Sequence, residues 1–247
     1  MQPIGAIDLL DVWERGALLR PFRRAAALVS AACRELSPEH IDALTLGDRD
    51  RLLLRARALT FGPGVKAVAS CPSCGTWLDV GFDANDVLAR IPTGGPTTIQ
   101  RDDYLVQFRL PTCSDIAAIA DEATPEEARQ EQALLRRCVL EARRDATTIA
   151  VDALPEPIVD LVAEQLARAD AGADVDSALT CDACAHAWTA PFDVVAFFWE
   201  EIDTWAERTL NDVHRLASAY GWSESDILAL GPRRRQRYLA LIAEQAR

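Results

Sequence analysis

The sequence contains none of the patterns that the common enzyme classes require. It lacks the glycine-rich loop with lysine that binds nucleotide phosphates, the Gly-x-Gly-x-x-Gly turn of dinucleotide-binding domains and the Gly-x-Ser-x-Gly turn of serine hydrolases. Its three histidines, His40, His186 and His214, stand apart from one another and from any candidate nucleophile. No catalytic site can be assembled from these residues, so we expect a protein that is not an enzyme.

Long apolar runs and lysine are also scarce. No stretch approaches the roughly 20 apolar residues of a membrane-spanning helix. The first residues lack the basic and apolar segments of a secretory signal, so we expect a cytoplasmic protein with no membrane partner. Lys66 is the only lysine, and the net charge of −12 makes nucleic acid an unfavoured partner. A chain of 247 residues is long enough for one or two domains with a real core.

Four of the seven cysteines occur as two Cys-x-x-Cys pairs with matching surroundings, Cys71 with Cys74 and Cys181 with Cys184. Each pair follows a short apolar stretch and precedes a small residue and a tryptophan. This spacing lets both sulfurs of a pair reach one ion from a tight turn, and two pairs supply the four thiolates of a tetrahedral site. The sequence therefore predicts a structural zinc ion that ties residues 65–80 to residues 178–190.

Other interpretations of these cysteines stay open. A redox pair is disfavoured because the pattern occurs twice without a thioredoxin-like βαβ pattern, and disulfides are uncommon in the cytoplasm. An empty relic of a metal site is a third alternative. Catalytic zinc is disfavoured because four sulfurs leave no position for water. His186 is interpreted as a flanking residue rather than a ligand. The remaining cysteines are interpreted as core residues: Cys33, Cys113 and Cys138.

Hydrophobic periodicity predicts an α+β protein that is mainly helical. The longest predicted helix spans about 194–219, where apolar residues recur at spacings of four and three before Gly221. A strand is expected at 104–110 and a loop at 91–99. Ser37, Asp48 and Ser223 are the expected N-caps of their helices. Further helices are expected at residues 7–19, 21–36, 38–44, 48–59, 115–120, 125–144, 158–169, 224–230 and from 232 onward.

These elements predict a small zinc-ribbon-like β module that is interrupted by a strand-plus-helices insert and flanked by N- and C-terminal helices. The two halves of the metal site then lie on opposite sides of the insert in the sequence. The expected regions are an N-terminal helical region at 1–64, the first zinc-knuckle half at 65–90, the insert at 91–177, the second zinc-knuckle half at 178–193 and a C-terminal helical region at 194–247.

Candidate partner-binding residues are concentrated near the C-terminus. The aromatic residues of the long helix occupy more than one face, so they either complete the core or dock a partner segment. The arginine run at 233–237 is either a solvated helix face or a docking patch for an acidic surface, with nucleic acid a weaker alternative. His214 is either a surface residue or a partner ligand. The candidates are Trp199, Trp205, His214, Tyr220, Trp222, Arg233, Arg234, Arg235 and Arg237.

The run from His214 to Leu230, with Tyr-Gly-Trp-Ser-Glu at 220–224, resembles the T4-type baseplate hub assembly chaperone family. That family occurs in contractile phage tails and contractile injection systems. Shorter stretches agree along nearly the whole chain, and the second knuckle departs from the family pattern by carrying Ala183 and Ala185 instead of proline and glycine. The agreeing stretches are 13–16, 46–54, 61–62, 71–75, 110–112 and 233–239.

The resemblance implies a non-enzymatic assembly factor or structural subunit of a baseplate hub. It implies baseplate hub, spike or tape-measure proteins as partners, either in the bacterial cytosol or within the assembled particle. The alternative hypothesis is a zinc-ribbon regulator that binds nucleic acid, which would bind DNA with a steep salt dependence. The choice between a transient chaperone and a permanent subunit stays open at this point, as does the choice between phage and injection system.

Overall fold

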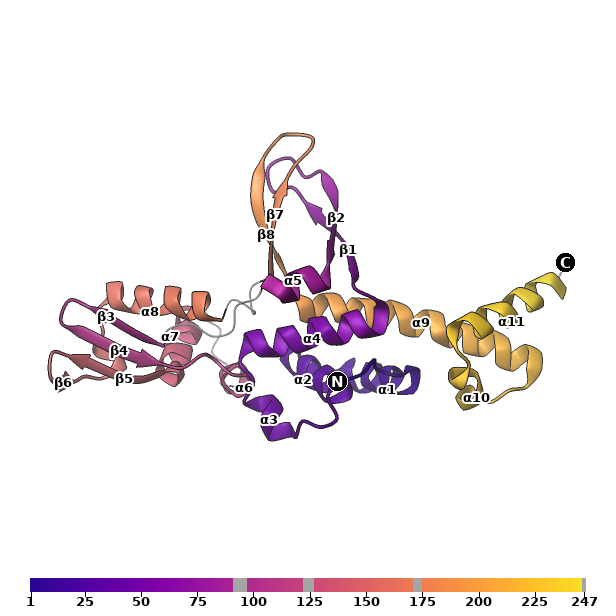
Figure 1. Ribbon diagram of the computed structural model, residues 1–247, viewed down its shortest axis with the longest axis horizontal. Helices are drawn as coiled ribbons and strands as arrows, with labels where there is room; N and C mark the ends of the chain where they lie inside the picture. The colour runs from indigo at the N-terminus through magenta and orange to yellow at the C-terminus, as the bar shows by residue number, and fades with distance from the viewer. Residues whose placement is uncertain (91–96, 122–126, 171–174, 246–247) are drawn as a thin grey trace.

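The computed structural model describes the whole chain except residues 91–96, 122–126, 171–174 and 246–247. The described residues form a mainly helical structure with three small antiparallel sheets. Figure 1 shows an elongated molecule in which two β-hairpins project from a helical centre. A sheet-and-helix insert lies at one end, and the C-terminal helices lie at the other. The helix α9 (Val194–Tyr220) connects the centre to the C-terminal end.

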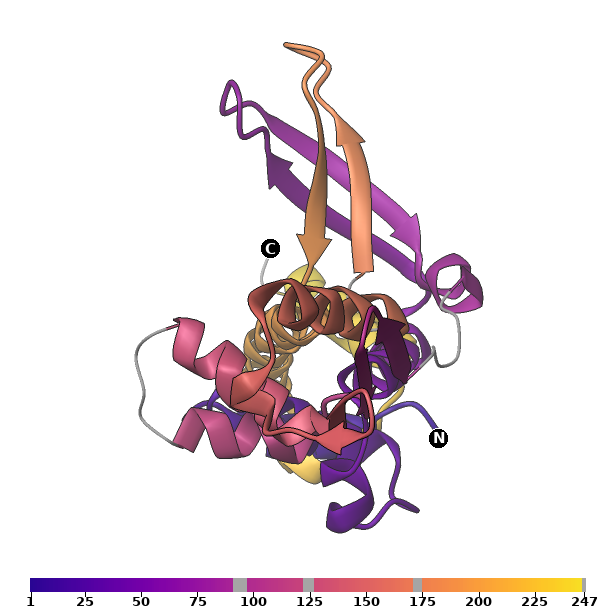
Figure 2. The same ribbon diagram turned by 90° about the vertical axis from the view of Figure 1, so that its left-hand side faces the viewer.

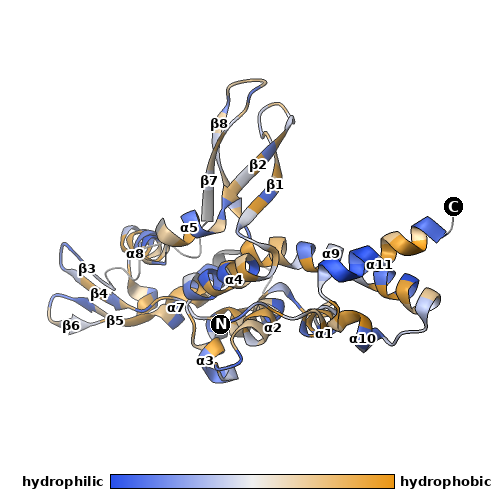
Figure 3. Cartoon of the chain, turned by 45° about the vertical axis from the view of Figure 1, so that its right-hand side comes forward, coloured by the Kyte–Doolittle hydropathy of each residue, from blue (hydrophilic) through white to orange (hydrophobic). Residues whose placement is uncertain are grey.

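Four N-terminal helices enclose the main core together with the first half of α9. Leu28, Leu53 and Phe198 are fully buried in this core, and Figure 3 shows that α2 is largely hydrophobic. Ser37 caps α3 as expected, because its hydroxyl accepts a hydrogen bond from the amide of His40. The four helices are α1 (Ala6–Gly16), α2 (Pro21–Ala32), α3 (Pro38–Asp42) and α4 (Leu46–Phe61).

The start of α4 and the end of α2 differ from the predictions. The N-cap of α4 is Thr45, not Asp48, because the Thr45 hydroxyl accepts the amide of Asp48 at 3.1 Å. Both residue types are good caps, so the local pattern did not separate them. Asp48 instead lies in the first turn, where its charge favours the helix dipole. The α2 helix ends at Ala32 rather than Leu36, since the backbone of Cys33 leaves the helical region.

The two hairpins are separate two-stranded antiparallel sheets. The first consists of β1 (Gly64–Ser70) and β2 (Trp77–Asp83), and the second of β7 (Val175–Thr180) and β8 (Ala187–Phe192). Figure 2 shows that the hairpins cross one another as they rise from the helices. A short helix, α5 (Ala84–Arg90), follows the first hairpin, whereas α9 follows the second. The zinc-ribbon fold as such stays a prediction.

The insert is a four-stranded antiparallel sheet with helices packed against one face. Its strands lie in the order β3 (Thr98–Arg101), β4 (Tyr104–Phe108), β5 (Val139–Arg144) and β6 (Thr147–Thr148). Val106 and Phe108 point into a second core, which Leu135 and Val162 complete from the helical side. The helical segments are α6 (Cys113–Asp121), α7 (Glu127–Cys138), the 3-10 turn η1 (Val151–Ala153) and α8 (Glu156–Ala169).

The insert contains more strand than the sequence predicted. The helix expected over 125–144 ends at Cys138, and residues 139–144 form β5 instead. Pairing of Ala142 with Val106 in the adjacent strand outweighs the local helix propensity of this segment. The loop expected at 91–99 is also shorter, since Thr98 and Ile99 already belong to β3, while residues 91–96 lie outside the described part of the chain.

The C-terminal helices are close to the predictions. The α9 helix is capped by the Asp193 side chain and ends at Gly221, which has a left-handed backbone. Ser223 caps α10 (Glu224–Ala229) by accepting the amide of Asp226 at 3.2 Å. The α11 helix (Pro232–Gln245) then packs back against α9. In the described residues, no helix combines the length and the apolar character needed to cross a membrane.

Candidate metal centre

The first pair of cysteines sits in a tight turn at the tip of the β1–β2 hairpin. The amide of Cys71 donates to the carbonyl of Thr76 at 2.9 Å, and the amide of Gly75 donates to the carbonyl of Cys71 at 2.9 Å. Gly75 has a φ of 74°, a left-handed conformation that glycine adopts without steric cost. These bonds hold Cys71 in a buried position and leave Cys74 exposed at the tip.

The second pair has the same geometry, although the sequence differs. The amide of Cys181 donates to the carbonyl of His186 at 2.9 Å, and the amide of Ala185 donates to the carbonyl of Cys181 at 2.8 Å. Ala185 has a φ of 57°, so it takes the left-handed position that glycine occupies in the first turn. The departure from the family pattern at Ala183 and Ala185 therefore leaves the turn intact. A left-handed alanine costs of order 1 kcal/mol, which the surrounding bonds must offset.

The four sulfurs lie together between the two hairpin tips, all within 4.8 Å of one another. The Sγ atoms of Cys71 and Cys184 are 3.7 Å apart, and those of Cys74 and Cys181 are 3.6 Å apart. A tetrahedral ion with metal–sulfur bonds of about 2.3 Å places its ligands about 3.8 Å apart. The two distances match that value and are far longer than the roughly 2.0 Å of a disulfide bond. The residues therefore fit a four-thiolate metal site, with ligands from both sides of the insert.

The thiols of the cluster differ in how readily they lose a proton. The Thr76 hydroxyl and amide lower the pKa of the Cys74 thiol to about 6. The amide of His186 acts in the same direction on Cys184, but the neighbouring sulfurs and desolvation together outweigh it and raise the pKa of Cys184 to about 11. One thiol thus ionises readily while another resists ionisation next to it. Four thiolates can coexist at this distance only when a metal ion compensates their charge.

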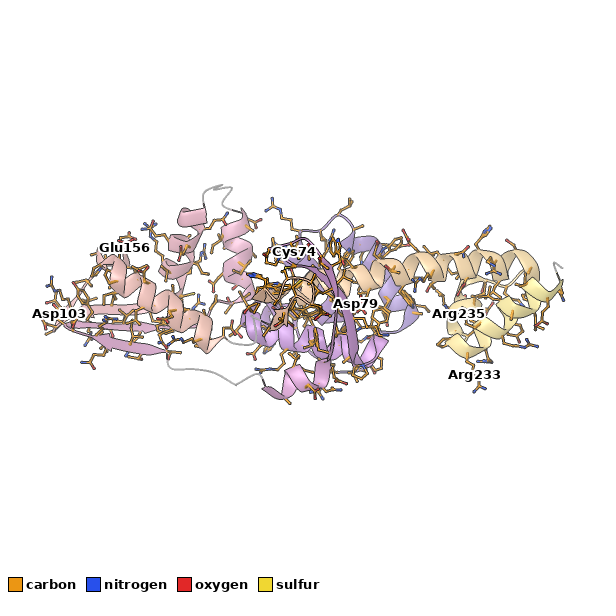
Figure 4. The ribbon with its side chains drawn as sticks, turned by 90° about the horizontal axis from the view of Figure 1, so that it is seen from above. Cys74, Asp79, Asp103, Glu156, Arg233 and Arg235 are labelled. Carbon is orange, nitrogen blue, oxygen red and sulfur yellow. The ribbon has the colours of Figure 1, made fainter. Side chains whose placement is uncertain are left out.

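His186 does not belong to the sulfur cluster, in agreement with its interpretation as a flanking residue. Its ring stacks on Trp188 with the ring centroids 6.0 Å apart. Among the other cysteines, Cys33 and Cys138 are buried and Cys113 is half-buried. Figure 4, which views the molecule from above, shows Cys74 over the helical centre.

A pair of aromatic rings connects the metal centre to the helical core. Phe82 and Phe192 contact edge to face at the hairpin bases, with the ring centroids 5.0 Å apart. Each phenylalanine stands eight residues after the second cysteine of its pair and directly before an aspartate at a helix start. Sequence analysis missed this pair, although the repeated Phe-Asp at equal distance from each Cys-x-x-Cys was a usable signal. The two hairpins therefore have the same spacing between the cysteine pair at the tip and the phenylalanine at the base.

The partner-binding candidates on α9 are divided between the core and the surface. Trp199 is only 9% exposed and packs over Gly16, with the guanidinium of Arg24 4.5 Å from its ring. Trp205 is half-buried and lines a groove at the base of the first hairpin beside Lys66. His214 is exposed on the helix surface. Trp77 at the start of β2 is 70% exposed and was not among the predicted candidates.

The remaining candidates lie in the C-terminal helices. Tyr220 and Trp222 stack with their ring centroids 4.7 Å apart, and Tyr238 closes the group at 4.9 Å from Trp222. All three rings are half-buried, so they pack the α9–α11 junction while keeping part of their surface accessible. The arginines differ among themselves, since Arg235 is buried while three are exposed: Arg233, Arg234 and Arg237.

Comparison with known proteins gives one family. The sequence model of a family described as "T4 bacteriophage base plate protein" matches residues 25–199 of this chain. This span contains both cysteine pairs and the insert, and it ends at Trp199 within α9, before the run from His214 to Leu230. No curated protein and no solved structure gives a significant match. A match over most of the chain shows that this protein belongs to the T4 bacteriophage base plate protein family.

Proposed function

We propose that this chain is a non-enzymatic assembly factor or structural subunit of a baseplate hub, in a contractile phage tail or a phage-derived injection system. The observation that carries the proposal is the family match over residues 25–199. The elongated shape supports it, because the hairpins, the insert and the C-terminal helices extend separately from one helical centre and offer surface to several neighbours. Baseplate hub, spike or tape-measure proteins are the proposed partners.

The proposed ion is zinc, and its proposed role is structural. Four cysteine thiolates with tetrahedral spacing are the donor set of structural zinc sites in proteins. Such an ion would link the tips of two hairpins that belong to distant parts of the sequence, and its binding free energy would contribute directly to folding. Because the four sulfurs occupy every position of a tetrahedron, they leave no site for a reacting water. This supports a role outside catalysis.

Elemental analysis tests the identity of the ion. We expect the purified protein to contain one zinc per chain, and a variant with Cys74→Ser and Cys184→Ser to contain none. Cys113→Ser is the matched control, because it removes a thiol outside the cluster and should retain the zinc. Purified protein without any stoichiometric metal would contradict the proposal.

Co-purification tests the proposed place in a baseplate. The affinity-tagged chain is expressed together with the tube, sheath, hub and spike genes of its own gene cluster. We expect it to recover at least one hub, spike or tape-measure protein at a fixed stoichiometry. Recovery of the chain as a free monomer, with all those proteins present and folded, would overturn the proposal. Mass spectrometry of finished particles then distinguishes a subunit, which stays in the particle, from an assembly factor, which leaves.

A further inference from the structure

The first turns of α11 carry a concentrated positive charge on a protein whose net charge is −12. Four of the first six residues of the helix are arginines, and its first turn contains no acidic residue. Figure 3 shows these turns as hydrophilic. The free backbone amides at a helix start add to the positive potential of such side chains. The C-terminal end of the molecule therefore differs in charge from the rest of the protein.

Arg235 is the buried residue of this cluster. It is only 8% exposed, and its Nη2 donates to the carbonyl of Leu230 at 3.3 Å, so the guanidinium lies at the turn that begins α11. Its Nε is buried without a hydrogen-bond acceptor. In the described part of the chain, no carboxylate forms an ion pair with Arg235. A buried guanidinium without a countercharge is costly, and an anion from outside would reduce that cost.

The exposed arginines extend the cluster towards solvent. Within the described residues, neither Arg233 nor Arg234 pairs with a carboxylate, whereas Arg237 pairs with Glu244 at 3.2 Å. Figure 4 shows Arg233 pointing away from the molecule. Arg234 lies one helical turn before Tyr238 and shares its face of α11. The surface thus combines free guanidinium groups with the edge of the Tyr220–Trp222–Tyr238 aromatic group.

We propose that this surface, the α11 arginine site (Arg233, Arg234 and Arg235), binds the carboxylates of an acidic segment of another protein. Guanidinium groups bind carboxylates in a bidentate geometry, and the adjacent half-buried rings offer apolar contact to the same segment. A protein segment is favoured over nucleic acid because the site spans only about one helical turn, which is too short to neutralise the successive phosphates of an extended nucleic-acid backbone. The inference rests on the proposed function, in which the chain is built into a protein assembly.

Fluorescence anisotropy with a labelled octaglutamate peptide tests the site on the full chain. We expect saturable binding that weakens as the salt concentration rises, because the contacts are ionic. The double variant Arg233→Glu/Arg234→Glu should bind roughly tenfold or more weakly. Arg215→Glu is the matched control, since it reverses an exposed arginine on α9 outside the site, and it should lower the affinity less than about twofold.

The buried residue needs a separate variant, because its loss can also disturb packing. Arg235→Lys keeps the charge but removes the forked geometry, so it should weaken octaglutamate binding several-fold while preserving the circular dichroism spectrum. Absence of binding by the wild-type chain, or an equal loss in Arg215→Glu, would overturn the proposal. Tighter binding to a DNA oligonucleotide of the same charge would also overturn it. A chain that recovers baseplate partners but ignores octaglutamate would refute this site while leaving the proposed function intact.

Discussion

At the scale of single residues, several side chains have roles that depend on one close neighbour. Trp199 fills the space above Gly16, where an added Cβ would lie 2.3 Å from Cη2 of the ring. Ala185 has a left-handed backbone because the turn between Cys181 and His186 requires one at this position. Asp115 is buried against Arg109, with the two carboxylate oxygens 2.6 and 2.9 Å from the guanidinium. Each contact makes a substitution effect predictable.

Replacing Gly16 by alanine should destabilise the protein, although alanine normally favours a helix. The clash with Trp199 forces the buried ring to move, and overpacking of this kind costs about 1–3 kcal/mol. Chemical denaturation measures the change in the free energy of unfolding. Gly64→Ala is the control, because a Cβ at Gly64 meets nothing within 4 Å. A stabilised Gly16→Ala protein would show that the ring is not held in place.

Asp115 should make stability depend on pH in the acidic range. The Arg109 guanidinium holds the pKa of Asp115 at about 2, below its ordinary value of 3.8. A lowered folded-state pKa stabilises the fold above about pH 4, and this contribution is lost as the pH falls towards about 2. Since Arg109 is partly exposed, we expect about 1–2 kcal/mol after solvent screening.

The measurement compares the free energy of unfolding of the wild type and Asp115→Asn across that pH range. At neutral pH the wild type should be more stable than Asp115→Asn by the whole expected contribution of about 1–2 kcal/mol. This difference in the free energy of unfolding should shrink towards zero near pH 2. Asp152→Asn, which removes an exposed carboxylate paired with Arg136, is the control and should show little difference at any pH. A difference for Asp115→Asn that stays constant between neutral and acidic pH would refute the assignment.

At the scale of elements, the stability of the two hairpins depends on the contacts at their tips and bases more than on the length of their strands. An isolated two-stranded hairpin is marginally stable in water. Here the sulfur cluster joins the two tips, and the Phe82–Phe192 contact joins the two bases. Between these points, alternate residues of each hairpin are half-buried and the others are exposed, as expected for strands with one packed face.

Removal of the cluster should therefore unfold both hairpins together. Cys71→Ser with Cys184→Ser leaves two sulfurs, which bind zinc too weakly to stabilise the tips. We expect the melting temperature to fall by about 10 °C or more and protease sensitivity to increase in residues 64–83. A chelator should have the same effect on the wild type. Cys113→Ser should melt close to the wild type, and equal melting of all three proteins would contradict a structural metal.

At the scale of the whole molecule, the insert is attached to the helical centre by a few specific contacts. The amide of Cys113 donates to the carbonyl of Leu44 at 2.9 Å. Both carboxylate oxygens of Asp170 accept the amide of Gly47, at 3.0 and 3.1 Å. Asp170 thus places a negative charge at the start of α4, where the helix dipole favours it. The end of α8 is connected to the centre through this bond.

Substitution of Asp170 should loosen the insert without unfolding its own core. Asp170→Ala leaves the buried amide of Gly47 without an acceptor, which costs about 1–3 kcal/mol. Hydrogen exchange should accelerate at residues 45–48 while exchange in β4 stays slow. Asp160→Ala, an exposed residue of the same helix, is the control and should change neither. Unchanged exchange at residues 45–48 in Asp170→Ala would mean that other contacts hold the insert.

The sequence alone determined the features that depend on local spacing. Both Cys-x-x-Cys pairs, the apolar period of α9 and the Ser223 cap were readable because each depends on residues within a few positions of one another. The meeting of the four sulfurs, predicted from this spacing, is confirmed by the structure. Only the tertiary structure decided that residues 139–144 pair with β4, and that Arg235 is buried without a countercharge from the described residues. These outcomes depend on contacts between segments far apart in the chain, and the free energy of such contacts leaves no periodic pattern in the sequence.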